Sequence, residues 1–260
     1  MDRKLFKNYI YSSLYQIILL VTPLIMTPYL TRVMGAGVLS INTYTANIVG
    51  WFVIFGMLGI GNYGNKSIAR VREDKKELSK TFIEIYLMQL MTLMISSIGY
   101  IIFINFIVTE YKLVYILQGI TLISVALDIA WFFYGIEDLK KLTIRNIFVK
   151  LLGVALIFIY IKDDNDLNLF ILINTISAVI GQLIMWLEVK KHLVFVKVSI
   201  KDIIRHIKPN IILFIPQIAI SVYSLLDITM LGTLYDDLRY VNFYEQAIKL
   251  VKMFMFLLLQ

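Results

Sequence analysis

The chain of 260 residues contains no cysteine, so it cannot form disulfide bonds, and its composition says nothing about the redox state of its compartment. Histidine is almost absent as well, because only His192 and His206 occur. Both lie in a charged stretch between apolar segments, and neither has the spacing to a partner that metal ligands show. We interpret both as surface residues, and the sequence predicts no metal ion and no cofactor.

Two further absences narrow the class of protein. The first apolar segment is too long for the hydrophobic region of a signal peptide, and no small-residue cleavage site follows it. We interpret it as a retained helix. The apolar segments also lack the alternation of polar and apolar residues that the strands of a membrane barrel show. The sequence therefore excludes a barrel of strands.

Apolar residues are abundant: they make up 59% of the chain, and the mean hydropathy is +0.79. Runs of about 20 apolar residues recur between charged loops, and each can cross a hydrocarbon core of about 30 Å. A segment in lipid must satisfy its own backbone hydrogen bonds, so these runs are helices. We predict an all-α polytopic membrane protein with about eight transmembrane helices, at 9–34, 41–64, 81–108, 113–134, 147–161, 169–189, 209–232 and 241–260.

The net charge of +7 raises the question of a nucleic-acid partner. Nineteen of the 25 Lys and Arg residues fall at the predicted ends and loops on one side of the membrane, and four fall on the other side. This bias places the N-terminus in the cytoplasm by the positive-inside rule. It also excludes nucleic acid as a partner, because the basic residues flank spans. The acidic run 163–166 is predicted to be a short outside turn.

A short repeat indicates the domain organisation. The pieces 32–35 (RVMG) and 41–44 (INTY) are answered late in the chain by 229–232 (TMLG) and 241–244 (VNFY). A repeat of this kind predicts that a helical hairpin begins one lobe near residue 9 and a second near residue 209. We therefore expect a six-helix lobe at 1–208 and, at 209–260, the first two helices of an incomplete second lobe.

The prolines follow the same division. Pro23 and Pro28 are predicted to interrupt the first helix, and Pro209 and Pro216 to begin and interrupt the seventh. Paired broken helices at corresponding places in two halves are typical of the working elements of transporters. The run 59–64 spells GxGxxG, but it closes a membrane helix and not a strand, so it is no dinucleotide site. We expect its glycines to let helices approach closely.

Ionisable residues inside spans are the candidate functional groups, since each costs about 2.5–3.5 kcal/mol at a lipid-facing midplane. Asp128 lies in the fourth predicted helix and Asp227 in the seventh. Spacings of three and four residues place the polar residues of the eighth helix on one face, which would form a cationic stripe for an anionic cargo. These residues are Asn242, Glu245, Gln246, Lys249 and Lys252.

Several pieces together resemble bacterial polysaccharide flippases of the Wzx type, within the multidrug/oligosaccharidyl-lipid/polysaccharide exporter superfamily. They are the R-x-x-G turn at 32–35, GMLGIGNYGNKSIAR at 56–70, DIAWFFYGIE at 128–137, LLDITMLG at 225–232 and YVNFYEQAIKLVK at 240–252. The resemblance covers nearly the whole chain. It implies two six-helix lobes around a central cavity, twelve to fourteen helices in all. With eight predicted helices, the chain is expected to be an N-terminal fragment.

The resemblance also implies a function, which is the export of undecaprenyl-pyrophosphate-linked oligosaccharides across the bacterial cytoplasmic membrane by alternating access, without enzyme activity. It implies lipids as partners, together with polysaccharide polymerase and chain-length machinery. Cations lining the cavity would receive the pyrophosphate, and amides and hydroxyls the sugar. By position these are Arg32, Lys249 and Lys252 for the pyrophosphate, and Asn242, Gln246, Tyr44 and Asn47 for the sugar; Asp128, Asp227 and Glu245 are the candidates for ion coupling.

Two other functions stay open from the residues alone. A drug or cation antiporter of the same superfamily would use Asp128 and Asp227 to attract a cationic cargo, although the paired lysines argue against it. A polytopic enzyme that polymerises glycans or transfers prenyl groups would need a large outside loop or clustered acids, and the predicted outside loops are short.

Overall fold

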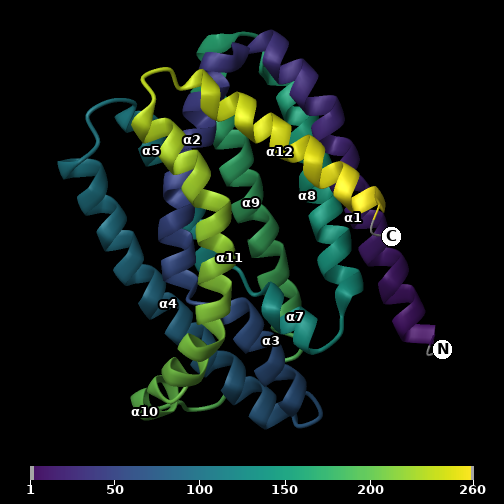
Figure 1. The fold of residues 1–260 in the computed structure, drawn as a ribbon. Helices are drawn as coiled ribbons and strands as arrows, with labels where there is room; N and C mark the ends of the chain where they lie inside the picture. The colour runs from purple at the N-terminus through teal and green to yellow at the C-terminus, as the bar shows by residue number, and fades with distance from the viewer. Residues whose placement is uncertain (1–2, 259–260) are drawn as a thin grey trace.

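The computed structural model describes residues 3–258, and in this range all regular structure is helical (Figure 1). The prediction of an all-α polytopic membrane protein is confirmed. The helices are α1 Arg3–Val33, α2 Gly35–Met57, α3 Ile60–Val71, α4 Lys75–Phe106, α5 Lys112–Gln118, α6 Ile120–Ala126, α7 Ala130–Gly135, α8 Leu139–Tyr160, η1 Asp164–Asp166, α9 Leu167–Val189, α10 Ile200–Ile204, α11 Ile207–Leu234 and α12 Arg239–Leu258.

All eight predicted membrane segments are mainly helical over residues 3–258; positions 259–260 of the last one lie outside the described residues. Only seven described segments are long and apolar enough to cross a membrane. The segment that falls short is α12, which carries several charged residues along its length. The division into lobes at residue 208 stays a prediction. The seven segments are Gln16–Val33, Gly35–Val71, Lys75–Phe106, Lys112–Gly135, Leu139–Tyr160, Asp164–Val189 and Ile200–Leu234.

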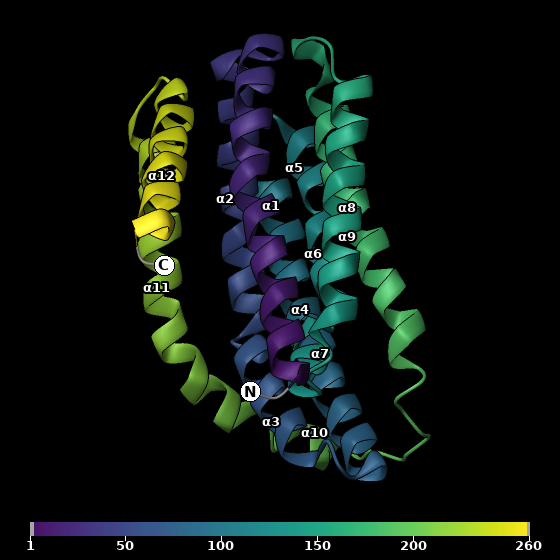
Figure 2. The ribbon, with the colours of Figure 1, turned by 90° about the vertical axis from the view of Figure 1, so that its right-hand side faces the viewer.

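The long helices run side by side between two ends of the bundle (Figures 1 and 2). The end that carries the loops 72–74, 136–138 and 190–199 is called the basic end here, and the end that carries the loops 107–111 and 235–238 the opposite end. Helix α2 packs against α4, α5, α11 and α12. It therefore connects the first six spans to the last two helices.

Two of the predicted spans are broken, and neither break is at a proline. The span 41–64 changes from α2 to α3 at Leu58 and Gly59, which both have left-handed backbone angles, with φ of 46° and 82°. A Cβ on Gly59 would lie 3.1 Å from the Phe214 backbone of α11, so glycine serves both the turn and the close approach. The span 113–134 is divided between α5, α6 and α7.

The break between α6 and α7 exposes backbone carbonyls inside the bundle, and side chains from other helices bind them. The buried Gln89 of α4 donates from Nε2 to the carbonyls of Val125 and Asp128, at 3.0 and 2.9 Å. Trp186 of α9 donates from Nε1 to the carbonyl of Leu127 at 2.9 Å. The side-chain amide oxygen of Gln89 in turn accepts from the indole N–H of Trp131 in α7, at 2.9 Å. These contacts make a broken helix tolerable in lipid.

The predicted interruption of helices at prolines is wrong. Helix α1 runs through Pro23 and Pro28 without a break, and α11 runs through Pro216. Helix α11 begins at Ile207, so Pro209 lies in its first turn, where the ring is compatible with a helix. Each interior proline removes one backbone hydrogen bond but leaves its helix intact.

The predicted repeat has a partial counterpart in the fold. Two helical hairpins are present, α1–α2 and α11–α12, as expected. However, the matching glycines serve different purposes, because Gly35 has φ of 74° next to the first turn, whereas Gly232 lies within α11 against the ring of Tyr44. A sequence match here does not mean an equivalent position.

Helices α3 and α7 pack closely because two glycines face bulky side chains. The expected close approach at the run 59–64 is confirmed for Gly59 and Gly64 and is wrong for Gly61, which has no atom within 4 Å of its Cβ position. A Cβ on Gly64 would lie 2.6 Å from Trp131, and one on Gly135 would lie 2.5 Å from Ile68. Around this contact lies an apolar core that includes the fully buried Phe82 and Phe132. This core holds the basic end together.

We expect Gly64→Ala to destabilise the protein by about 1–3 kcal/mol, because the added methyl group overpacks against the Trp131 ring. Thermal unfolding in detergent would measure this loss. Gly61→Ala is the matched control in the same helix, since nothing lies within 4 Å of its Cβ position. It should be neutral or stabilise by up to about 1 kcal/mol through helix propensity. Equal effects of the two substitutions would contradict the packing argument.

Candidate substrate cavity

A cavity of about 440 Å³, called the polar cavity here, opens between α1, α8, α9 and α12. Three of its lining residues are basic, and no acidic residue lines it among the residues that the structure describes. Amide and hydroxyl groups supply the rest of its polar lining. The polar and basic residues are Thr22, Thr27, Arg145, Asn146, Lys150, Asn174, Ser177, Gln182 and Lys249.

Helix α8 supplies two of the three cations. Arg145 donates from Nη1 to the Gln182 amide oxygen of α9 at 3.4 Å. Lys150 is only partly exposed, and no described carboxylate lies within the 4 Å of an ion pair from its Nζ. Lys249 reaches the same cavity from α12. Because Lys249 pairs with Glu245 at 2.8 Å, Lys150 is the cation of the lining for which the described residues offer no carboxylate partner.

The sequence did not single out Arg145 and Lys150. Both were counted among the basic residues at the ends and loops of one side, although Lys150 already lay within the predicted span 147–161. In the structure α8 begins at Leu139 and includes both. A signal was present in the sequence, because polar residues recur at 145, 146 and 150 directly before the apolar run that ends the helix. Their inclusion in a membrane span makes them functional candidates.

A second cavity of about 520 Å³, called the apolar groove here, lies between α1 and α12. Its lining is mostly aliphatic and includes Leu19, Leu20, Leu24 and Leu250. It shares three lining residues with the polar cavity, so the two adjoin. The shared residues are Pro23, Thr27 and Lys249.

The face of α12 that carries the predicted polar stripe turns towards α1 and α2. Glu245 accepts from the hydroxyl of Thr43 in α2 and pairs with Lys249 at 2.8 Å. Gln246 lies 3.2 Å from the hydroxyl of Thr27 in α1 and donates to the buried Asn242 at 3.0 Å. Phe243, Val251 and Phe254 of the predicted apolar face are more than half exposed. Leu250 of the same face lines the apolar groove beside Lys249 and Lys252. The prediction of two faces therefore holds for the first turns of α12 and not for Leu250.

The structure does not bring all the predicted site residues together. Lys252 lines the apolar groove, and the exposed Arg32 lies at the end of α1, outside both cavities. Asp128 accepts from the backbone N–H of Ala130 at 2.8 Å and so caps the start of α7. Asp227 accepts from the Tyr244 hydroxyl. The three acidic candidates therefore have separate partners.

Helices α2 and α11 meet along a line of specific contacts. The Trp51 indole donates to the Thr229 hydroxyl at 2.8 Å, and that hydroxyl lies 2.8 Å from the Asn47 amide oxygen. Tyr44 packs against Gly232 one turn further along. Two side chains proposed for sugar binding, Tyr44 and Asn47, are thus engaged between helices.

The interpretation of both histidines as surface residues is wrong. His206 is 7% exposed and lies among polar side chains at the basic end. His192 is partly buried against the rings of Phe132 and Phe133, and this burial lowers the pKa of its imidazole. The run 163–166 forms a capped turn, as expected, in which Asp163 accepts from the backbone of Asn165. Among the described residues no three His, Cys, Asp or Glu gather to hold a metal.

Seven apolar spans define a polytopic membrane protein, and three of them, with α12, line a cationic cavity that adjoins an apolar groove. The chain belongs to the polysaccharide biosynthesis protein family, whose model matches residues 5–259. The sequence-based resemblance to this group is thereby confirmed.

Two curated relatives carry the name "Putative O-antigen transporter". The protein from Shigella dysenteriae is 29% identical over 232 residues, which cover 85% of this chain and 56% of the relative. The protein from Escherichia coli K12 is 24% identical over 243 residues, which cover 91% of this chain and 58% of the relative. The chain thus spans little more than half the length of these relatives. No solved structure matches it.

We expect Thr229→Val to loosen α11 from α2, because it removes the hydroxyl that Trp51 and Asn47 share and leaves both without this partner. An unpaired buried polar group costs about 1–3 kcal/mol. Hydrogen exchange of α11 should become faster. Thr233→Val is the control, since its exposed hydroxyl bonds only to the backbone of its own helix. Unchanged exchange in Thr229→Val would contradict this role.

Proposed function

We propose that the protein flips lipid-linked oligosaccharides across the bacterial cytoplasmic membrane by alternating access. One observation carries the proposal: a cavity with three cations and no described acidic lining residue adjoins an apolar groove. The names of the two relatives support it, since both are described as transporters of O-antigen. The proposed activity is transport and involves no bond cleavage.

The pyrophosphate of the cargo would bind in the polar cavity. Lys150 and Lys249 would donate charge-assisted hydrogen bonds to its oxygens, and the guanidinium of Arg145 would add a planar pair of donors. Such bonds offset part of the cost of removing the anion from water. Arg32 and Lys252, which lie outside this cavity, would act earlier or later along the path.

The other parts of the cargo have matching surfaces. The sugar hydroxyls would meet Asn146, Asn174 and Gln182 in the polar cavity. The isoprenoid chain would leave through the apolar groove, where aliphatic side chains of α1 and α12 replace lipid. Lys249 lies in the lining of both and would mark the junction between headgroup and tail.

The orientation of the protein in the membrane follows from the charge bias of the loops. The basic end would face the cytoplasm, with the N-terminus on that side. Asp128, Asp227 and Glu245 remain candidates for ion coupling, since carboxylates inside a membrane bundle commonly belong to ion pathways. Polysaccharide polymerase and chain-length proteins would receive the exported unit.

The antiporter alternative fits the cavity less well. A cationic drug would meet Arg145, Lys150 and Lys249, and the nearest candidate acid, Glu245, already pairs with Lys249. Ethidium efflux that depends on Asp128 would support the antiporter and count against a flippase.

We expect Lys150→Ala to weaken cargo binding by about 10- to 100-fold, the loss of one hydrogen bond to a charged group. The substitution belongs in the chromosomal gene, so that any further part of the natural protein is present. Surface polysaccharide should fall, and lipid-linked oligosaccharide should accumulate on the cytoplasmic face, as measured by mass spectrometry of extracted lipids.

Lys140→Ala is the matched control, because this exposed lysine begins the same helix and lines neither cavity. It should leave export unchanged. Normal export in the double variant Lys150→Ala, Lys249→Ala would overturn the assignment of the polar cavity to the headgroup.

A further inference from the structure

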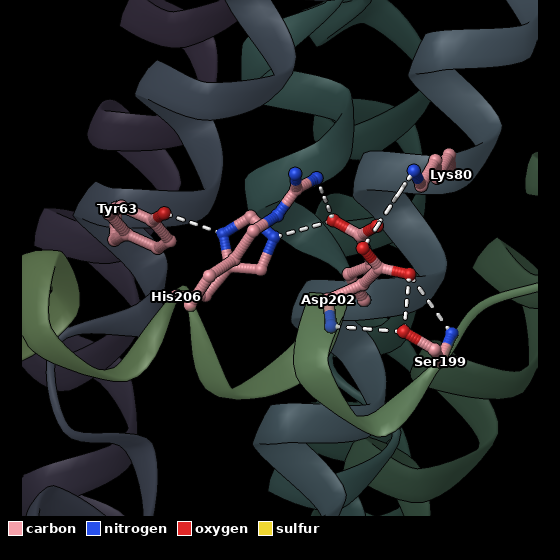
Figure 3. A network of polar contacts seen from close by, with 7 residues as sticks. Tyr63, Lys80, Ser199, Asp202 and His206 are labelled. Carbon is pink, nitrogen blue, oxygen red and sulfur yellow. Dashed lines mark hydrogen bonds and ion pairs between the residues drawn. The ribbon is translucent and has the colours of Figure 1, made fainter.

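A network of polar side chains at the basic end lies outside both cavities and has no part in the proposed path of the cargo (Figure 3). At its centre is Glu84 of α4, whose side chain is fully buried. Its Oε2 accepts from Arg205 Nη2 and from His206 Nε2, both at 2.6 Å. Its Oε1 is buried and accepts no hydrogen bond from a described residue. Burying a carboxylate in this way is costly unless ion pairs and hydrogen bonds compensate the charge.

Two partners of Glu84, Arg205 and His206, come from the segment between α9 and α11. Arg205 and His206 follow the short helix α10 and directly precede Ile207, the first residue of α11. His206 also contacts α3, through a hydrogen bond of 2.6 Å between its Nδ1 and the Tyr63 hydroxyl. The imidazole therefore attaches the start of α11 to both α3 and α4.

Helix α11 is the least buried of the spans, and this attachment joins its start to α3 and α4. Only 6% of the apolar window in its span is buried, against 17–39% for the other six. Figure 2 shows α11 curving away from the bundle above its start. Near the opposite end, the bonds of Thr229 and the contact of Gly232 hold it to α2. Loss of the attachment would therefore free the start of α11 at the basic end.

The bonds of His206 leave room for one more proton. In the neutral imidazole, Nε2–H donates to Glu84 and Nδ1 accepts from the Tyr63 O–H. A proton added at Nδ1 would instead donate to the Tyr63 oxygen, and Glu84 would then face an imidazolium. Both ring nitrogens would keep a partner in each state, and the bond to Glu84 would become stronger because both sides carry charge.

The other charges around His206 are two carboxylates and three cations. Glu84 faces Arg205 directly and Lys80 at 3.9 Å, and Asp202 of α10 lies 3.9 Å from the same Lys80. Arg70 of α3 acts on Tyr63 from the other side. The side chains of Arg205 and Lys80 are 51% and 31% exposed, so water at the basic end reaches the network although Glu84 and His206 are buried.

We propose that His206, with Glu84 and Tyr63, forms a proton-binding site that controls how firmly α11 is anchored to the first six spans. Proton uptake from the basic end strengthens the anchor, and proton loss lets the start of α11 move away from α3 and α4. The coupling of this movement to export rests on the proposed function, whereas the anchor itself does not.

The absence of cysteine makes a direct test straightforward. Lys76→Cys in α4 and Ile212→Cys in α11 place spin labels on two exposed positions near the basic end, where release of the anchor frees the start of α11. Distances between the labels are measured by pulsed electron paramagnetic resonance in nanodiscs without cargo, from about pH 5 to about pH 8, where imidazoles change charge. The ratio of anchored to released molecules should fall by about fivefold or more as the pH rises.

His206→Gln keeps an amide donor for Glu84 but cannot take up a proton, so the distances should no longer change with pH. His192→Gln is the control, because it removes the other histidine at the same end and should keep the change. If His206→Gln does not fold, Tyr63→Phe serves instead: it removes the acceptor of the added proton and should move the midpoint to lower pH.

A pH response that persists in His206→Gln, or a wild type without a response, would overturn the proposal. So would an unchanged midpoint in Tyr63→Phe. Because no cargo is present, these outcomes are independent of flipping. Lys150→Ala should reduce export but keep the pH response. If Lys150→Ala reduces export and no protein, wild type or variant, responds to pH, the proposed function stands and the proton-controlled anchor is ruled out.

Discussion

The fold depends on one constraint, which is that polar groups in a lipid-embedded chain must find their partners inside the protein. Unbroken helices meet it by themselves. Where a helix is interrupted, the partners come from elsewhere in the sequence, as Gln89 and Trp186 show at the break between α6 and α7. Broken helices are thus possible only because the helices around them carry the right amide and indole groups.

The same constraint explains how polar side chains are distributed between helices. The hydroxyl of Thr229 joins α11 to α2, and Glu245 and Gln246 join α12 to α2 and α1. Each of these contacts satisfies groups that lipid could not. The polar cavity is the exception, because Lys150 has no described carboxylate partner there. A charge that the protein leaves uncompensated points to a ligand that compensates it.

Local patterns predicted what is local. Runs of about 20 apolar residues gave the helices, and spacings of three and four residues gave the two faces of the first turns of α12, since both depend only on neighbours in the sequence. The proline rule failed because α1 and α11 each tolerate the loss of a hydrogen bond. The actual breaks at Leu58 and near Asp128 depend on contacts with other helices.

The residues that were missed depend on distant partners. Glu84 lies in a predicted span and, as an ionisable residue, could have been singled out, but its pairing with His206 joins positions 122 residues apart. His206 looked like a loop residue because only the folded chain buries it. Arg145 and Lys150 were absorbed by the rule that basic residues flank spans, which does not distinguish a flank from the first turns of a helix.

The polarity of helix α12 has a consequence for how the protein is inserted into the membrane. Its charged stripe leaves it too polar to count among the spans, so it would not partition into lipid by its own hydropathy. Among the described residues, Gln246 and Glu245 of its polar face bond to Thr27 of α1 and Thr43 of α2, which emerge from the ribosome some two hundred residues earlier. Membrane integration of this helix therefore has to wait for the first hairpin, which acts as an intramolecular insertion partner during biogenesis.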